Sequence, residues 1–254
     1  MKGSQMEYYP IFVDMRGRTV LLVGGGHVAL EKIGKLVEAG AQVTLVAPDL
    51  IPQVQAFVDD GRVTLLQRRY ESGDVEGFDV VFVATDNGAV NTFVADEARA
   101  RKIWVNAADD AKNCDFILPS LVQRGRIAIA ASTGGASPAL ARWLREHLDE
   151  FLSEEVVALG DLLGDVRIEA RVRDRACAAS CDRTQPPPPL LCSTCPNRIP
   201  ADAWQEAIDD ELFALLRAGQ MTEAKARLIH TLGIDQPLQP HGATPTTSSH
   251  TAAE

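Results

Sequence analysis

The sequence has 254 residues, of which 46% are hydrophobic and 24% are charged, a composition typical of a globular protein with a sizeable core. Its formal net charge of −10 disfavours a nucleic-acid-binding protein and binding to anionic membranes, because both need a surface rich in Lys and Arg. The pattern shows no signal peptide and no window approaching the ~20 apolar residues of a membrane span. We therefore expect a cytoplasmic location.

The N-terminal part of the chain alternates short apolar runs with helical patterns. Strands are predicted at 19–23, 42–47, 62–66, 79–84 and 103–106, and helices at 27–39, 51–60 and 89–101. Gly40 stands where a C′ glycine would end the first helix. Strands that alternate with helices imply a Rossmann-like parallel sheet with right-handed crossovers, so the predicted fold class is α/β.

The pattern changes after Asn106. Two short strands are predicted at 115–121 and 126–131, followed by helices at 137–151 and 156–173, a Cys- and Pro-rich break at 176–199 and further helices at 200–233. Ser137 is the expected N-cap of the first of these helices, with Pro138 at the tolerated N1 position. The last residues lack apolar periodicity and are predicted to be disordered.

A glycine motif joins the first predicted strand to the first predicted helix. Gly24, Gly26 and Ala29 occupy the three small positions of G-x-G-x-x-[GA]. The first position gives a tight turn, the second lets a pyrophosphate approach the backbone, and the third packs helix against strand. The amides at the helix N-terminus then attract the phosphates. The motif predicts a dinucleotide site, and the alternative is a glycine-rich turn without a ligand.

Two further positions lie where strands of this sheet are predicted to end. Asp49 stands where an acid would bind the ribose 2′-OH of NAD and repel the 2′-phosphate of NADP. Because Pro48 precedes it and Asp is common in turns, an ordinary turn is equally compatible with the pattern. Thr85 follows the fourth strand at the carboxyl edge of the sheet, where ligands bind in open α/β folds, and the alternative is a helix cap at Thr85 or Asp86.

The chain resembles the siroheme synthase N-terminal module family, the precorrin-2 dehydrogenases and sirohydrochlorin ferrochelatases. Four ordered segments carry the resemblance: YPIFVDMRGRTVLLVGGGHVALEK, VATDNGAVN, VNAADDAKNCDFILPS and ASTGGASPALARWLRE. The resemblance covers roughly Tyr9 to Phe151. It implies an NAD-binding domain at 1–115, a small dimerisation region at 116–152, and a helical C-terminal region at 153–235 with a Cys-rich insertion at 176–199. Residues 236–254 are expected to be a disordered tail.

The resemblance also implies an activity. Members of the family oxidise precorrin-2 to sirohydrochlorin with NAD, and some also insert Fe(II) to give siroheme. The cofactor-binding residues carried over are Gly24, Gly26, His27, Val28, Pro48, Asp49, Thr85 and Asn106. The resemblance further implies a homodimer that binds a tetrapyrrole, with no nucleic acid or membrane as partner. No separate uroporphyrinogen methyltransferase domain is expected in this chain.

The family's catalytic aspartate, in an Asn-Val-x-Asp pattern, matches Asp109, with Ala107 where the family often has valine. Dehydrogenation sends a hydride to the nicotinamide and a proton to a base, so a carboxylate at the carboxyl edge of the sheet suits the reaction. Without the resemblance, Asp109 and Asp110 are better explained as a solvated turn.

A second loop matches the family in the C-terminal half of the chain. Ser132, Thr133, Gly134 and Gly135 correspond to its Ser-Ser-Gly-Gly loop, with Thr133 as a departure, and are expected to bind the tetrapyrrole. Precorrin-2 is rich in carboxylates, so this acidic protein needs a local basic cleft. The candidate side chains are Arg124, Arg126, Arg142 and Arg145, although exposed arginines on a helix are usually no more than a solvated face.

Four cysteines fall outside the family pattern. Cys177, Cys181, Cys192 and Cys195 form two close pairs, Cys-x3-Cys and Cys-x2-Cys, that could enclose a tetrahedral Zn²⁺ or an iron–sulfur cluster. Two disulfides or uncoordinated thiols are the alternatives, and a reducing cytoplasm disfavours disulfides. These cysteines also leave open another class of function, an NAD(H)-binding protein that senses redox state or metal without turnover. Cys114 is interpreted as a small packing residue.

Overall fold

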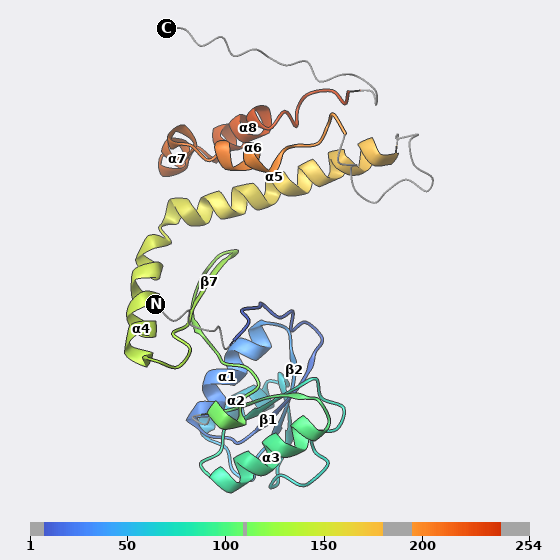
Figure 1. The fold of residues 1–254 in the computed structure, drawn as a ribbon, viewed down its shortest axis with the longest axis vertical. Coiled ribbons are helices and arrows are strands. Elements are labelled where there is room, and N and C mark those ends of the chain that lie inside the picture. The colour runs from blue at the N-terminus through green and yellow to red at the C-terminus, as the bar shows by residue number, and fades with distance from the viewer. Residues whose placement is uncertain (1–7, 109–110, 180–194, 240–254) are drawn as a thin grey trace, which may run out of the picture. The chain divides into compact units, whose positions relative to one another are not determined.

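A computed structural model of the chain describes residues 8–108, 111–179 and 195–239 (Figure 1). The chain divides into two compact units, Met1–Pro119 and Ser120–Glu254, and the finer division predicted for residues 116–235 stays a prediction. Within the described ranges, no helix has the length and apolar character needed to cross a bilayer. The cytoplasmic location stays a prediction.

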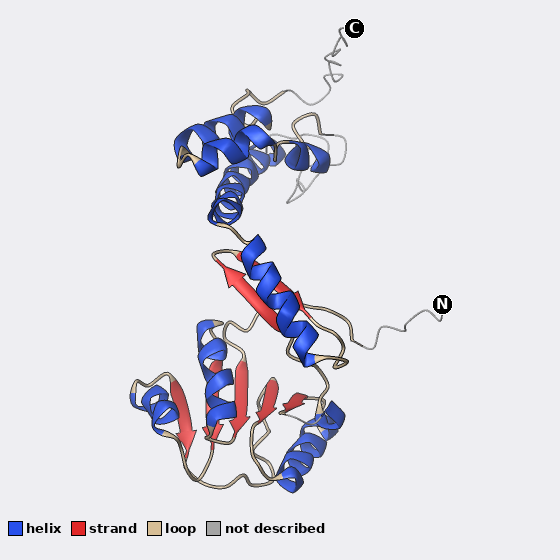
Figure 2. Cartoon of the chain, turned by 90° about the vertical axis from the view of Figure 1, so that its left-hand side faces the viewer, coloured by secondary structure: helices blue, strands red, loops and turns tan. Residues whose placement is uncertain are grey.

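A wholly parallel, five-stranded sheet forms the centre of the first unit (Figure 2). Its strands are β1 (Thr19–Val23), β2 (Gln42–Val46), β3 (Val63–Leu66), β4 (Val80–Val83) and β5 (Trp104–Ala107). Their spatial order is β3-β2-β1-β4-β5, so the direction in which strands are added reverses beside β1. This order confirms the predicted Rossmann-like α/β class and gives a topological switch point between β1 and β4.

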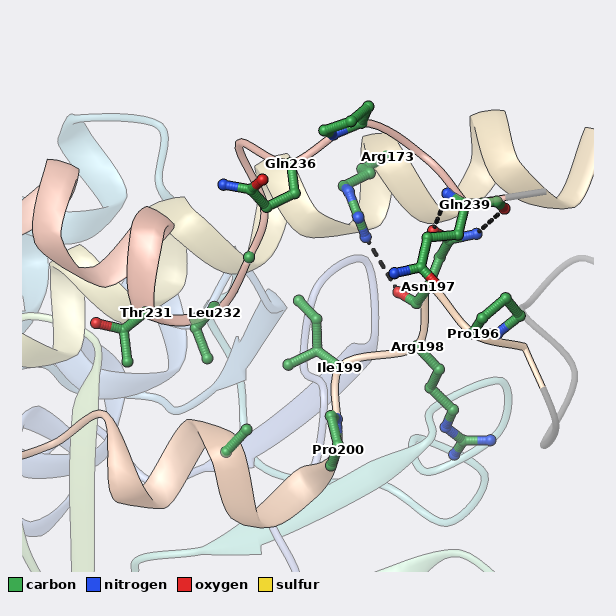
Figure 3. Close-up of a pocket in the computed structure, with 13 residues that line it drawn as sticks. Arg173, Pro196, Asn197, Arg198, Ile199, Pro200, Thr231, Leu232, Gln236 and Gln239 are labelled. Carbon is green, nitrogen blue, oxygen red and sulfur yellow. Dashed lines mark hydrogen bonds between the residues drawn. The ribbon is translucent and has the colours of Figure 1, made fainter. Parts of the chain in front are cut away.

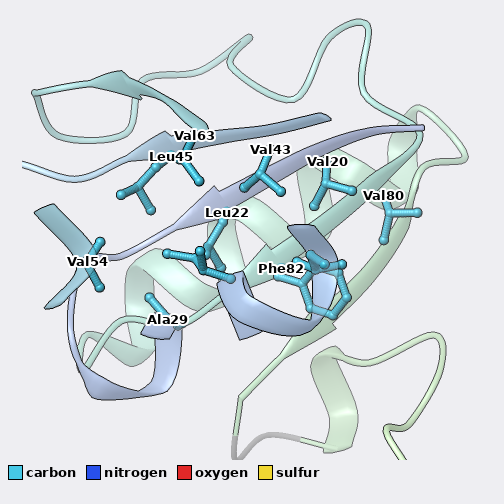
Figure 4. Packing of buried hydrophobic residues seen from close by; sticks show 12 residues of the cluster. Val20, Leu22, Ala29, Val43, Leu45, Val54, Val63, Val80 and Phe82 are labelled. Atoms are coloured by element: carbon cyan, nitrogen blue, oxygen red, sulfur yellow. The ribbon is translucent and has the colours of Figure 1, made fainter. Parts of the chain in front are cut away.

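Helices cover both faces of this sheet, which is why its strands are continuous apolar runs in the sequence. On one face Leu22 of β1 belongs to a buried cluster with Ala29 and Val54 (Figure 4). On the other face Val81 of β4 packs with Val94. The helices of this unit are α1 (His27–Glu38) and α2 (Pro52–Asp59), on the first face, and α3 (Gly88–Ala100), on the second.

The ends of two helices test the sequence predictions. Gly40 has φ +79° and its N–H donates to the carbonyl oxygen of Val37, so the predicted C′ glycine of α1 is confirmed. The alternative interpretation of this segment, a helix cap at Thr85 or Asp86, is wrong for α3. Asn87 is the N-cap, and its Oδ1 accepts the N–H groups of Ala89 and Val90 at 3.0 and 3.2 Å. Three polar residues in succession left the choice of cap open in the sequence.

The second unit begins with an antiparallel pair, β6 (Ser120–Arg124) and β7 (Ile127–Ala131), on which α4 (Pro138–Phe151) packs. The strand predicted at 115–121 is therefore displaced. Asp115 instead belongs to the first unit, where its N–H donates to the carbonyl oxygen of Val105 at 2.8 Å and its carboxylate accepts the Val105 N–H at 3.0 Å. These two bonds hold the start of the segment beside β5.

A helical core makes up the rest of the second unit as far as the structure describes it. The long helix α5 packs against α7 and α8 through buried residues that include Leu162, Leu212 and Leu228 (Figure 1). The helices are α5 (Glu154–Ala179), α6 (Ala201–Glu206), α7 (Asp210–Arg217) and α8 (Met221–Thr231). The break predicted from residue 176 starts too early, because Cys and Ala fit a helix and α5 continues through Ala179. Gly219, at φ +70°, lies in the turn that divides the region predicted as helical at 200–233 into α7 and α8.

Candidate cofactor and substrate site

The glycine loop connects β1 to α1 beside the switch point. Gly24 has φ +116°, a region that favours glycine, and a Cβ there would lie 2.3 Å from the carbonyl oxygen of Ala84 at the end of β4. A Cβ on Gly25 would lie 2.3 Å from the carbonyl oxygen of Asp49, after β2. These two glycines therefore allow the loop after β1 to pack closely against the loops that follow β4 and β2.

Gly26 has a different environment. A Cβ built on it would meet no atom within 4 Å among the described residues. Gly26 is also the N-cap of α1, and it offers no side-chain cap to the first amides of that helix. Open space beside uncapped helix amides fits a pyrophosphate. Ala29, fully buried between α1 and the sheet, fills the third position of the motif as predicted.

The loop after β2 is tied to this cradle. The N–H of Ile51 donates to the carbonyl oxygen of Gly25 at 3.0 Å. The N–H of Gly24 donates to the carbonyl oxygen of Val46 at 2.9 Å. Pro48 and Asp49 lie between these two attachments and are exposed. The carboxylate of Asp49 is thus carried on a loop fixed beside the glycines, which is the position that a ribose-binding acid requires.

The first helical positions and the loop after β4 complete the rim of the cradle. His27 is exposed and Val28 is partly buried at the start of α1. The Thr85 hydroxyl donates to Oδ1 of Asn91 at 2.5 Å, while Nδ2 of Asn91 donates to the Thr85 carbonyl oxygen at 3.1 Å. Asn91 was missed in the sequence, where its signal is a polar residue on the buried face of α3. It fixes the loop that carries Thr85.

The end of β5 is held from both sides. Asn106 is buried and its Nδ2 donates to the carbonyl oxygen of Phe116 at 2.9 Å, while the thiol of Cys114 donates to the carbonyl oxygen of Ala107 at 3.0 Å. Asn106 therefore has a structural task, and its contact with the cofactor stays a prediction. The predicted catalytic residue, Asp109, comes two positions after β5 and lies outside the described residues.

A buried carboxylate that was missed in the sequence stabilises the connection between β3 and β4. Glu97 of α3 accepts hydrogen bonds from the hydroxyl of Tyr70, from Ser72 at 3.0 Å and from the N–H of Gly73 at 2.7 Å, and it pairs with Arg101 at 3.2 Å. Burial raises the pKa of Glu97, but these hydrogen bonds outweigh it and hold the pKa below its usual value. Burial and the hydrogen bond to Glu97 raise the pKa of the Tyr70 hydroxyl.

The predicted substrate loop lies in the second unit. Oγ of Ser132 accepts the N–H of Gly134 at 3.1 Å, and Oγ1 of Thr133 accepts the N–H of Ser137 at 3.1 Å. Ser137 accepts the N–H of Leu140 at 3.2 Å, which confirms it as the N-cap of α4. Gly134 and Gly135 have positive φ, and a Cβ on either would meet no described atom within 4 Å. The two side chains shape the turn and the two glycines leave its backbone open.

The four candidate arginines are all paired with carboxylates. The pairs are Arg124–Asp149 at 2.9 Å, Arg126–Asp165 at 2.9 Å, Arg142–Glu146 at 2.9 Å and Arg145–Glu146 at 3.7 Å. They therefore do not form a patch of uncompensated positive charge. Exposed pairs of this kind contribute about 0–1 kcal/mol, so a substrate carboxylate could exchange with the protein carboxylates at little cost.

Two of the four clustered cysteines are described. Cys177 of α5 and Cys195 are both buried, with their Sγ atoms 3.7 Å apart, and Nδ2 of Asn197 donates to Sγ of Cys177 at 3.2 Å. Burial and the neighbouring Cys195 raise the pKa of the Cys177 thiol. Cys181 and Cys192 lie outside the described residues. Within the described ranges no group of three or more His, Cys, Asp or Glu side chains could hold a metal ion.

The sequence is similar to two protein families that follow each other along the chain. Residues 11–120 match a family described as putative NAD(P)-binding, and residues 124–150 match one described as sirohaem biosynthesis protein central. The first match spans the five-stranded sheet and its glycine cradle. The first unit is therefore an NAD(P)-binding Rossmann-like domain.

Individual proteins that are similar in sequence or fold point to a more specific family. The chain is 34% identical to a siroheme synthase of Nitrosococcus oceani, over 88% of this chain and 43% of the relative, and 32% identical to one of Photobacterium profundum, over 93% and 46%. It thus spans less than half the length of these relatives. The solved structure of SirC, precorrin-2 dehydrogenase, shares the fold, with a TM-score of 0.66 and 24% identity over 88% of this chain and 100% of that one. The chain belongs to the siroheme synthase N-terminal module family.

Proposed function

We propose that this protein oxidises precorrin-2 to sirohydrochlorin with NAD, a step in siroheme biosynthesis. The observation that carries the proposal is the cradle at the switch point, where Gly26 leaves open space beside the uncapped amides of α1. Family membership supports the choice of substrate, since the relatives are named siroheme synthases and the fold neighbour is named a precorrin-2 dehydrogenase.

The residues of the chain divide the work of this reaction. The amides of α1 bind the pyrophosphate, and the loops that follow β2 and β4 enclose the two ends of the cradle. NAD held in this cradle would supply the hydride acceptor. Asp109 is the proposed base that accepts the proton, because it follows β5 by two residues and all five parallel strands end at the same edge of the sheet. The loop from Ser132 to Gly135 is the proposed contact to the tetrapyrrole.

The proposed cofactor is NAD rather than NADP. Asp49 is exposed beside the glycine loop and its carboxylate can accept hydrogen bonds from ribose hydroxyls, whereas a 2′-phosphate would be repelled. The four clustered cysteines have no part in this reaction as proposed. No described residue is assigned to the insertion of Fe(II), so the proposed reaction ends at sirohydrochlorin.

An anaerobic assay with purified protein, precorrin-2 and NAD tests the proposal. We expect NADH and sirohydrochlorin to form, and we expect Asp109→Asn to lower the turnover number by at least about 100-fold while the Kd for NAD changes little. Binding of NAD without turnover by the unsubstituted protein would favour the sensing function instead. A parallel reaction with Fe(II) shows whether siroheme forms as well.

We also propose that the protein is a homodimer joined through α4. None of the residues of α4 is buried in the described chain, and Leu140, Trp143 and Phe151 are 48%, 52% and 66% exposed. A single amphipathic helix that packs on β6 and β7 and still exposes three large apolar side chains fits an interface with a second copy. Light scattering of the purified protein measures the oligomeric state.

A further inference from the structure

A buried amide of α3 holds the loop that follows β4. Asn91 is only 7% exposed, and its side chain makes two hydrogen bonds to one residue of that loop. Its Oδ1 accepts the hydroxyl of Thr85 at 2.5 Å, and its Nδ2 donates to the Thr85 carbonyl oxygen at 3.1 Å. The Thr85 hydroxyl in turn accepts the N–H of Asn87 at 3.2 Å. The hydroxyl proton and the carbonyl oxygen of Thr85 are therefore both used within the protein.

The loop can offer a ligand its backbone amides instead. Within the described part of the chain, the N–H groups of Thr85 and Asp86 have no hydrogen-bond acceptor. The nitrogen of Thr85 lies 3.3 Å from the place that a Cβ on Gly24 would occupy, so this amide adjoins the glycine loop. The side chain of Asn87 already accepts two N–H groups of the first turn of α3. The open donors thus belong to the loop itself.

A cavity of about 300 Å³ in the second unit provides a contrast (Figure 3). On its wall, the side-chain amide of Asn197 donates to the carbonyl oxygen of Gln239 at 2.9 Å and accepts the Gln239 N–H at 2.7 Å. Arg173 donates to the carbonyl oxygen of Asn197 at 3.0 Å. These groups stabilise the wall by bonding to one another. Backbone N–H groups without a protein acceptor bond to water or to a ligand, so the loop after β4 is the better candidate for a ligand contact.

The sheet topology decides which part of a dinucleotide this loop would meet. A dinucleotide in an open α/β fold crosses the switch point, with its pyrophosphate at the N-terminus of α1. The acid that follows β2, here Asp49, lies on the side of the adenosine ribose. Because β4 and β2 flank β1 on opposite sides, the loop that carries Thr85 lies on the side of the nicotinamide half.

We propose that Asn91 is a positioning residue for the nicotinamide half of NAD. By holding Thr85, it keeps the N–H groups of Thr85 and Asp86 beside Gly24, where they donate to oxygen atoms of that half. Asn91 does not itself touch the cofactor, and the Thr85 hydroxyl serves to hold the loop. The inference rests on the proposed function, because it takes NAD as the ligand, but it does not depend on turnover.

Equilibrium binding of NAD and of ADP to the full-length protein tests the inference without precorrin-2. ADP contains the adenosine and the two phosphates but lacks the nicotinamide half, so it reports whether the rest of the cradle is intact. Asn91→Leu removes both hydrogen bonds to Thr85. We expect its Kd for NAD to rise about tenfold and its Kd for ADP to change by less than about twofold. Asp96→Asn, an exposed polar change on the same helix, is the matched control and should alter neither Kd.

Variants of Thr85 separate positioning from direct contact. Thr85→Val removes the hydroxyl and keeps both amides, and it should raise the Kd for NAD at least about threefold. The double variant should bind NAD no more weakly than Asn91→Leu alone, because both substitutions disrupt the same clamp. Thr85→Ser keeps the hydroxyl and should bind NAD within about twofold of the unsubstituted protein.

Several results would overturn the inference. An unchanged Kd for NAD in Asn91→Leu would contradict it directly, and additive losses in the double variant would show that the Thr85 hydroxyl binds NAD itself. Equal losses for NAD and ADP in both single variants would show that the clamp only supports the fold. Protein that gives the expected binding results but leaves precorrin-2 unchanged would instead overturn the proposed function alone.

Discussion

The sheet of the first unit and the helix α4 of the second unit bury their apolar side chains to different degrees. In the first unit, helices cover both faces of a five-stranded sheet, and its central strands β1 and β4 are almost fully buried. In the second unit, α5, α7 and α8 share a core, whereas α4 leaves Trp143 and Phe151 exposed. The sheet of the first unit is thus covered by helices of its own chain, whereas α4 leaves apolar side chains uncovered, for which we propose a second copy of the chain as partner.

The same contrast exists on a smaller scale inside the glycine loop. Gly24 and Gly25 are required by contacts within the protein, whereas Gly26 faces open space. One loop thus separates positions that the fold needs from a position that a ligand needs. A substitution at Gly24 should therefore mainly lower stability, whereas a substitution at Gly26 should mainly weaken NAD binding.

The largest effect is expected for Gly24→Ala. The new Cβ would lie 2.3 Å from the Ala84 carbonyl oxygen at a positive φ, so we expect the free energy of unfolding to fall by roughly 2–5 kcal/mol. Gly26→Ala should lower stability by less than about 1 kcal/mol and weaken NAD binding at least about tenfold. Denaturant unfolding and NAD titration of both variants separate the two roles. Equal loss of stability in both variants would contradict the account.

Glu97→Gln should lower the free energy of unfolding by roughly 2–3 kcal/mol, because the hydrogen bonds from Tyr70, Ser72 and Gly73 lose a charged, buried acceptor. Glu76→Gln is the matched control, since Glu76 contacts Arg101 from an exposed position and should cost less than about 0.5 kcal/mol. Denaturant unfolding of the two variants measures the difference.

The pH dependence of stability gives an independent test of Glu97. Its pKa is lowered in the folded protein, so its contribution is fully present above the ordinary glutamate value of about 4.3 and is lost as the pH falls through the folded value. Glu97→Gln should therefore cost most at neutral pH and progressively less below about pH 4. A cost that does not change with pH would show that the carboxylate charge is not what stabilises the 70–73 connection.

Trp143→Glu tests whether the exposed face of α4 is an interface. We expect the dimer Kd to rise at least about 30-fold, because a large aromatic side chain at an interface commonly contributes 2 kcal/mol or more. Stability of the separated chain should hardly change, since Trp143 is half-exposed within it. Glu150→Gln, an exposed polar change on the same helix, is the control. Light scattering across a concentration series distinguishes the proposed dimer from a monomer.

The smallest effect is expected for Asp49→Asn. Removing this exposed carboxylate should reduce the preference for NAD over NADP by about tenfold, mainly through tighter binding of NADP, with no loss of stability. Titration with each dinucleotide measures the ratio. An unchanged ratio would assign the discrimination to another residue of the cradle.

Much of the first unit could be predicted from the sequence, for a physical reason. Strands buried on both faces must be apolar at nearly every position, so β1 and β4 are visible as continuous runs, and Gly40 marks the end of α1. The glycine spacing predicted the cradle as well. It could not show that Gly25 is sterically required, because that contact comes from the carbonyl oxygen of Asp49, far along the chain.

Other features depend on hydrogen bonds to residues distant in the sequence, which a local sequence pattern does not reveal. The apolar segment after Asp115 has the composition of a strand, but Asp115 bonds to Val105 of β5 and the next strand starts only at Ser120. Glu97 is similar, because a charged residue in a helix gives no sign that Tyr70 and Ser72 will surround it. Long-range hydrogen bonds decided both cases.

An anaerobic single-turnover reaction tests the central claim most directly. Precorrin-2 and NAD are mixed with the purified protein, and the absorbance of NADH and of sirohydrochlorin is followed together. If the cradle positions NAD for oxidation of precorrin-2, the two products should appear at the same rate and in equal amounts, and Gly26→Ala should slow both at sub-saturating NAD. Protein that binds NAD and leaves precorrin-2 unchanged would contradict the account.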